Sequence, residues 1–217
     1  DLDLLGDLGI TVFRTSISWS RLYPNGDEET PNQEGIDFYH KLFKKCRQKK
    51  MKVLVTLAHF DIPFGLIETY GAWRDRQVID FYLRFAKTCF EEFGSLVDYW
   101  ITFNEINIVL HSPFSGAGLA IEEGEDRDQV LFQSAHHMLL ASSLAVKACK
   151  EICPKTQIGC MIAGGSFYPY SCNPKDVWKF MLDDRLNTFF VDVQVNGAYP
   201  FYMENILTEK GVTLTVS

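Results

Sequence analysis

Long apolar runs and an excess of basic charge are both missing from this 217-residue sequence. Its uninterrupted apolar runs extend over only a handful of residues, far short of the roughly 20 that span a bilayer, so we expect no membrane role. Binding to nucleic acid needs a basic surface, and the net charge of −7 disfavours it. No basic segment followed by an apolar one opens the sequence, as in a secretory leader. Residues 1–9 instead resemble the end of a helix, so we expect earlier sequence to precede them.

The six cysteines lack the spacing of a disulfide framework or of a zinc site. They lie singly in segments of helix or strand character, in a chain much longer than a disulfide-stapled mini-protein. Cys149 and Cys153 lie four residues apart, but no His or Cys pair follows at zinc-site spacing. We therefore expect reduced structural thiols, a cytoplasmic location, no metal and no cofactor.

The sequence does contain a regular alternation of short β-branched runs and longer amphipathic stretches. This alternation is typical of parallel strands joined by helices. The expected strands are 10–17, 52–58, 97–103 and 157–163. The expected helices are 2–8, 36–50, 76–93 and 128–152, followed over 173–210 by helical pieces broken at Gly197 and Pro200.

The expected fold is an α/β (β/α)8 barrel of which about half is present. No Gly-rich phosphate loop follows any strand, which disfavours the alternative of a doubly wound open sheet. A whole barrel takes about 250 residues or more, and the fourth expected strand ends only at residue 163. We therefore predict one partial barrel domain over 1–217 that contains strands 2 to 5 and lacks the first strand and the later ones.

Polar and aromatic side chains follow the expected strands at the carboxyl ends, where a parallel barrel carries its catalytic groups. Those we single out are Arg14, Trp19, His59, Asn104, Glu105 and Tyr168, with Asp61 and Asn107 close behind two of them.

Glu105 is the candidate proton donor for cleavage of a glycosidic bond. The leaving-group oxygen is poor, and a carboxylic acid in a pocket that raises its pKa can protonate it near neutral pH. Asn104 would donate to the sugar 2-hydroxyl, and His59 would contact other hydroxyls. Trp19 would offer an apolar floor for the ring.

Several of these residues also have simpler explanations. An arginine such as Arg14 is more often a salt-bridge partner, and an isolated histidine such as His59 is more often structural. Asp61 would simply cap the following turn. Other residues are expected to be structural or solvated: the packing tryptophans Trp73, Trp100 and Trp178, the helical histidines His136 and His137, and the loop glutamates Glu122, Glu123 and Glu125.

Three motifs resemble those of glycoside hydrolase family 1. The segment FRTSISW (13–19) is similar to that family's second-strand motif, and VTLAHFDIP (55–63) is similar to its third-strand segment. The segment YWITFNE (99–105) looks like its acid/base strand. The resemblance implies a barrel enzyme that hydrolyses β-glycosides with retention, needs no cofactor, uses Glu105 as general acid/base, and holds the sugar with Arg14, His59 and Asn104.

Segments 116–119 and 167–174 resemble the bacterial 6-phospho-β-glucosidase branch of that family. Its members act in the cytoplasm on disaccharides that are phosphorylated during uptake. The alternatives are a plain β-glucosidase or β-galactosidase, a non-catalytic sugar-binding half-barrel, or a barrel lyase that uses His59 and Asp61.

The family's nucleophile is a second glutamate in an Ile/Val-Thr-Glu-Asn-Gly motif, and no such motif occurs up to Ser217. Retaining hydrolysis needs two carboxylates about 5–5.5 Å apart, so we expect the 217 residues alone to be inactive. An open half-barrel has unpaired strand edges, so we also expect it to form homo-oligomers or to pair with a missing half.

Overall fold

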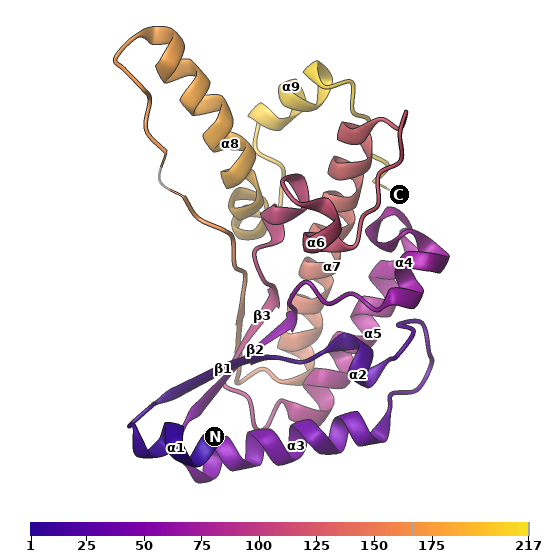
Figure 1. Ribbon diagram of the computed structural model, residues 1–217, viewed down its shortest axis with the longest axis vertical. Coiled ribbons are helices and arrows are strands. Elements are labelled where there is room, and N and C mark those ends of the chain that lie inside the picture. The colour runs from indigo at the N-terminus through magenta and orange to yellow at the C-terminus, as the bar shows by residue number, and fades with distance from the viewer. Residues whose placement is uncertain (166, 217) are drawn as a thin grey trace.

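The computed structural model describes residues 1–165 and 167–216 and contains one parallel sheet (Figure 1). Its strands are β1 (Val12–Ser16), β2 (Lys52–Ala58), β3 (Tyr99–Phe103) and β4 (Gln157–Gly159). They pair in the order β1-β2-β3-β4, and every pairing is parallel. Parallel strands added in chain order with helical crossovers are the arrangement found in (β/α) barrels.

The helices cover one face of the sheet and leave the other face open, so that the molecule is crescent-shaped (Figure 1). The helices of the repeating units and of the C-terminal part are α1 (Leu2–Asp7), α3 (Gln33–Gln48), α5 (Gln77–Phe93), α7 (Arg127–Ile152), α8 (Pro174–Asn196) and α9 (Tyr202–Glu209). Further helical segments lie in the loops after the strands: α2 (Trp19–Leu22), α4 (Phe64–Tyr70), η1 (Ala72–Arg74), η2 (Ile106–Leu110) and α6 (Pro113–Ala117).

Hydrophobic periodicity explains why these segments form these elements. In β2, the alternate side chains Val53, Val55 and Leu57 are fully buried beneath the helices. In α5, the buried side chains recur every three or four residues, as in an amphipathic helix packed on a core. Each large apolar side chain buried in this way contributes roughly 1.5–3 kcal/mol to stability.

Most of the expected elements are present, but the end of the fourth strand and the burial of one tryptophan differ from expectation. The fourth strand ends at Gly159 rather than at 163, because beyond it the β3–β4 ladder gives way to a bond from the N–H of Ile106 and to the side chain of Asn107. Trp73 and Trp100 are buried as expected, but Trp178 on α8 is 58% exposed.

No helix in the described part of the chain is long and apolar enough to cross a membrane. Association of the half-barrel stays a prediction.

Glu125 is exposed, as the sequence suggested, but it is also held in an ion pair. Arg74 donates to it through both terminal nitrogens, at 2.6 and 2.7 Å, and also donates to the carbonyl of Ala120. The backbone N–H of Glu122 donates to the same carboxylate at 2.7 Å. The bond from Arg74, followed by that from Glu122, lowers the pKa of Glu125 from 4.5 to about 2. This two-point ion pair fastens the loop before α7 to η1.

We expect Glu125→Gln to lower the free energy of unfolding at neutral pH. Because the folded-state pKa is depressed, the stabilisation is fully present above 4.5 and is lost as the pH falls through about 2. The difference between the two proteins should therefore shrink below pH 4.5 in thermal unfolding followed by circular dichroism. Glu123→Gln, in the same exposed loop, is the matched control. A difference that stays constant down to pH 2 would contradict the ion pair.

Candidate active site

Arg14 and Asn104 meet across three strands at the carboxyl end of the sheet. Nη2 of Arg14 on β1 donates to Oδ1 of Asn104 at 2.8 Å and to the hydroxyl of Thr56 on β2 at 3.3 Å. The backbone N–H of Asn104 donates to the carbonyl of Ala58 at 2.9 Å, which extends the β2–β3 ladder past the strand end. With Oδ1 engaged, Asn104 can offer its Nδ2 amine to a ligand. Arg14 thus orients the Asn104 amide. The sequence had suggested only a sugar contact or a salt bridge for this arginine.

Glu105 follows Asn104 in a left-handed backbone conformation. Its φ is 45° and its ψ is 55°, and it immediately precedes η2, where its carbonyl accepts from the N–H of Ile108 at 2.9 Å. This conformation costs a non-glycine residue about 1–2 kcal/mol. Residues held in it are concentrated at functional sites, where the surrounding structure imposes the geometry. The half-buried Glu105 side chain is therefore set by the turn rather than by the strand.

The loop after β2 has a similar turn. Phe60 also has a positive φ, of 68°, and the N–H of exposed His59 donates to Oδ1 of Asp61 at 3.0 Å. Burial raises the pKa of the Asp61 carboxyl, and the bond from His59 partly opposes that effect. Asp61 thus accepts from the residue two positions before it rather than capping the turn that follows, and His59 is left at the surface of the same strand end.

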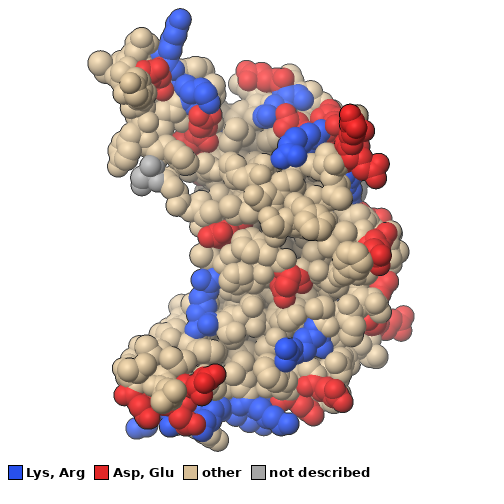
Figure 2. All heavy atoms as spheres, viewed as in Figure 1, with Lys and Arg blue, Asp and Glu red and all other residues tan. Residues whose placement is uncertain are grey.

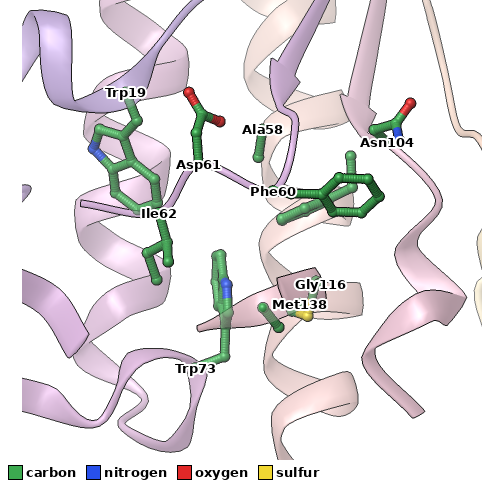
Figure 3. Close-up of a pocket in the computed structure, with 11 residues that line it drawn as sticks. Trp19, Ala58, Phe60, Asp61, Ile62, Trp73, Asn104, Gly116 and Met138 are labelled. Carbon is green, nitrogen blue, oxygen red and sulfur yellow. The ribbon is translucent and has the colours of Figure 1, made fainter. Parts of the chain in front are cut away.

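A small pocket lies beneath these loops, between Trp73, Asp61, Phe60 and Asn104 (Figure 3). Its enclosed volume is about 20 Å³, which holds a water molecule but not a sugar ring. The molecule is also hollowed on its open face (Figure 2). Next to the turn at Glu105, a hollow of about 310 Å³ is lined by seven residues: Asn107, His111, Ala163, Gly164, Gly165, Phe167 and Asn187.

Trp19 does not provide the sugar-stacking floor expected from the sequence. Its ring is only 1% exposed and stacks on Phe85 of α5, with centroids 5.4 Å apart. Trp73 and Tyr82 pack against its other sides, at 6.3 and 5.6 Å. The chain turns into α2 at this residue, and that turn directs the indole into the core rather than toward the open face.

Tyr168 is also not brought to the site. Its ring is 82% exposed, and it lines a separate surface pocket with Asp176 and Lys179 of α8. The structure therefore places Tyr168 apart from Asn104 and Glu105, and its contact to a sugar stays a prediction. In the described part of the chain, no three His, Cys, Asp or Glu side chains gather as metal ligands.

Asn107 is the residue whose importance the sequence did not reveal. Its Nδ2 donates to the carbonyl of Ala163 at 3.1 Å, and the N–H of Ala163 donates to its Oδ1 at 2.8 Å. It is 1% exposed. Its position two residues after Glu105 was the only signal, because the partner lies 56 residues further along the chain.

Comparisons with known proteins agree on one family. A family model described as Glycosyl hydrolase family 1 matches residues 1–217. The 6-phospho-beta-glucosidase AscB of Escherichia coli is 58% identical over 214 residues, which are 99% of this chain and 45% of that protein. Aryl-phospho-beta-D-glucosidase BglH of Bacillus subtilis is 48% identical over 217 residues, all of this chain and 46% of that protein.

Solved structures with a similar fold include a family 1 β-glucosidase. A family 1 β-glucosidase from Thermotoga maritima superposes with a TM-score of 0.84 at 29% identity, over 96% of this chain and 46% of that one. The virulence factor SghA of Agrobacterium tumefaciens gives 0.86 at 29% identity, over 100% and 47%. The chain thus spans about half the length of the relatives it matches.

The burial of Trp19 can be tested by stability. We expect Trp19→Ala to lower the free energy of unfolding by about 3–5 kcal/mol, because it empties a packed aromatic site. Tyr168→Ala removes an exposed ring and should change that free energy by less than about 0.5 kcal/mol. Urea titration followed by circular dichroism measures both. Equal effects of the two substitutions would contradict the placement of Trp19 in the core.

Proposed function

The chain belongs to glycosyl hydrolase family 1, and from that premise we propose that it carries the proton-donating part of a retaining β-glycosidase site. Its four-stranded sheet is part of the (β/α)8 barrel of that family, as the sequence predicted. The observation that carries the proposal is Glu105, a glutamate with a left-handed backbone just past β3, directly after an Asn104 that Arg14 orients.

In the proposed reaction, Glu105 protonates the glycosidic oxygen as the bond to the anomeric carbon breaks. Positive charge then develops on the sugar, and a hydrogen bond from Asn104 Nδ2 to the 2-hydroxyl strengthens in that transition state. Because Arg14 holds Oδ1 at 2.8 Å, the amide is oriented before substrate arrives and needs little reorganisation. A second carboxylate must attack the anomeric carbon from the opposite face.

We propose a 6-phospho-β-glucoside as the substrate and the cytoplasm as the location. Support for both comes from the names and identities of the relatives, 58% and 48% for two enzymes of phosphorylated β-glucosides. The plain β-glucosidase from Thermotoga maritima is similar in fold but only 29% identical. It therefore supports an unphosphorylated β-glucoside as the substrate less strongly than those two relatives support a phosphorylated one. The six cysteines are free thiols, a state that a reducing compartment maintains.

A hybrid enzyme tests the role of Glu105. These 217 residues would replace the aligned segment of the Escherichia coli relative, and the hybrid should hydrolyse nitrophenyl β-glucoside 6-phosphate faster than the unphosphorylated glucoside. Glu105→Gln should lower kcat/KM by roughly 10²–10⁴-fold on poor leaving groups, which depend on proton donation. In Glu105→Ala, azide should restore turnover of an activated substrate and form a glycosyl azide.

Glu123→Gln in the hybrid is the matched control and should retain full activity. An unaltered rate in Glu105→Gln would overturn the assignment of the proton donor. A hybrid that cleaves the unphosphorylated glucoside better would overturn the assignment of the substrate alone.

We further propose that the 217 residues by themselves do not turn over substrate. Double displacement needs a nucleophile about 5–5.5 Å from the acid, and the sequence contains no second motif of the expected kind. The purified chain should show only background release of nitrophenol from the phosphorylated glucoside. Turnover at an enzyme-like rate that is abolished by Glu105→Gln would refute this.

A further inference from the structure

We infer that Asn107 is a positioning residue for Glu105, because its side-chain amide ties the turn that carries the proton donor to the backbone beyond β4. The inference rests on the proposed function of Glu105. It concerns a residue that touches no reacting atom and acts only through the backbone conformation of its neighbour.

The β3–β4 register shows what Asn107 replaces. Tyr99, Trp100 and Ile101 pair with Gln157, Ile158 and Gly159, where the ladder ends. Four residues further along both strands, the same register would place Glu105 beside Ala163. The chain has instead left the strand in the left-handed turn, and the amide of Asn107 makes both of the backbone contacts, at 2.8 and 3.1 Å, that a strand neighbour would make to Ala163.

The turn at Glu105 is thereby anchored on both sides. Before it, the N–H of Asn104 donates to Ala58 at the end of β2. After it, the N–H of Ile106 donates to the carbonyl of Met161 at 3.2 Å, and Asn107 holds Ala163. A non-glycine residue leaves the left-handed region unless its surroundings hold it there. The contacts to the end of β2 and to the chain beyond β4 are those surroundings.

Only an amide of this length satisfies both groups of Ala163. Aspartate would accept from the N–H but would repel the carbonyl oxygen, and leucine has a similar size but neither donates nor accepts. Because Asn107 is 1% exposed, either substitution removes a buried partner, and both backbone groups of Ala163 lose their hydrogen bonds to it. Either substitution should release the turn and change the direction of the Glu105 carboxylate.

The chain itself allows a direct test of the anchor. Amide hydrogen exchange of the 217-residue protein should become faster over 104–108 and 161–163 in Asn107→Leu. Gln129→Leu is the matched control, because the Gln129 amide makes the same two contacts to the backbone of Thr213, at 2.9 and 3.0 Å, away from Glu105. Exchange over 104–108 should not change in that variant. Unchanged exchange in Asn107→Leu would overturn the anchor.

Leaving-group dependence in the hybrid enzyme tests the effect on the proton donor. If the Glu105 carboxyl points in the wrong direction, kcat/KM should fall only for substrates whose leaving group needs protonation. Asn107→Asp and Asn107→Leu should therefore lower kcat/KM by about 10–100-fold for alkyl and phenyl glycosides, but by less than about threefold for the dinitrophenyl glycoside. Gln129→Leu should leave both classes of substrate unchanged.

The outcomes separate the two proposals. Suppose that Glu105→Gln lowers kcat/KM selectively for poor leaving groups, while Asn107→Asp lowers it equally for all substrates or for none. The positioning role is then wrong and the proposed function stands. If Glu105→Gln itself shows no such selectivity, the proposed function of Glu105 is wrong. Asn107→Asp is the more conservative variant and keeps the test usable if Asn107→Leu does not fold.

Discussion

The parallel register of β2, β3 and β4 is the constraint on which the site depends. Because it fixes where each strand ends, it places Asn104 one residue past the end of β3, in reach of Ala58 and Arg14. A slip of one residue would exchange the faces of β3. Trp100, which now packs against Phe90 of α5 with centroids 5.1 Å apart, would then turn to the open face. Burial of the helix-facing side chains thus determines the geometry of the polar ones.

The polar groups of the site are held by a few bonds between strands, not by one dense network. Net contributions of about 0.5–1.5 kcal/mol per hydrogen bond are enough to offset the roughly 1–2 kcal/mol cost of the left-handed turn at Glu105. Removing one such bond should therefore leave a folded protein with a displaced carboxylate. This is why positioning and stability can be measured separately here.

The fold was largely predictable from the sequence because hydrophobic periodicity is a local signal. β2 was predicted with its observed bounds, and Asn104 and Glu105 were placed correctly just past β3. The orientation of Trp19 was not predictable, since one short turn decides whether its indole enters the core or the open face. The separation of Tyr168 from Asn104 and Glu105 was not predictable for a similar reason, because position after a strand does not determine which surface a loop side chain lines.

Contacts between distant segments were invisible for a different reason. The pairs Arg14 with Asn104, Arg74 with Glu125, and Asn107 with Ala163 join residues 90, 51 and 56 positions apart. Nothing in the local pattern of either partner indicates the other. These contacts nevertheless position the Asn104 amide, the loop before α7 and the turn at Glu105. The sequence therefore indicated the candidate chemical residues better than it indicated the contacts that hold them.

A crystal structure of the hybrid enzyme with an unreactive β-thioglycoside 6-phosphate bound would test the central claim most directly. The account predicts a Glu105 carboxyl oxygen within hydrogen-bond reach of the glycosidic sulfur, with Asn104 Nδ2 about 2.6–3.2 Å from the 2-hydroxyl. A sugar bound with its glycosidic atom closer to Asp61 or His59 than to Glu105 would contradict it.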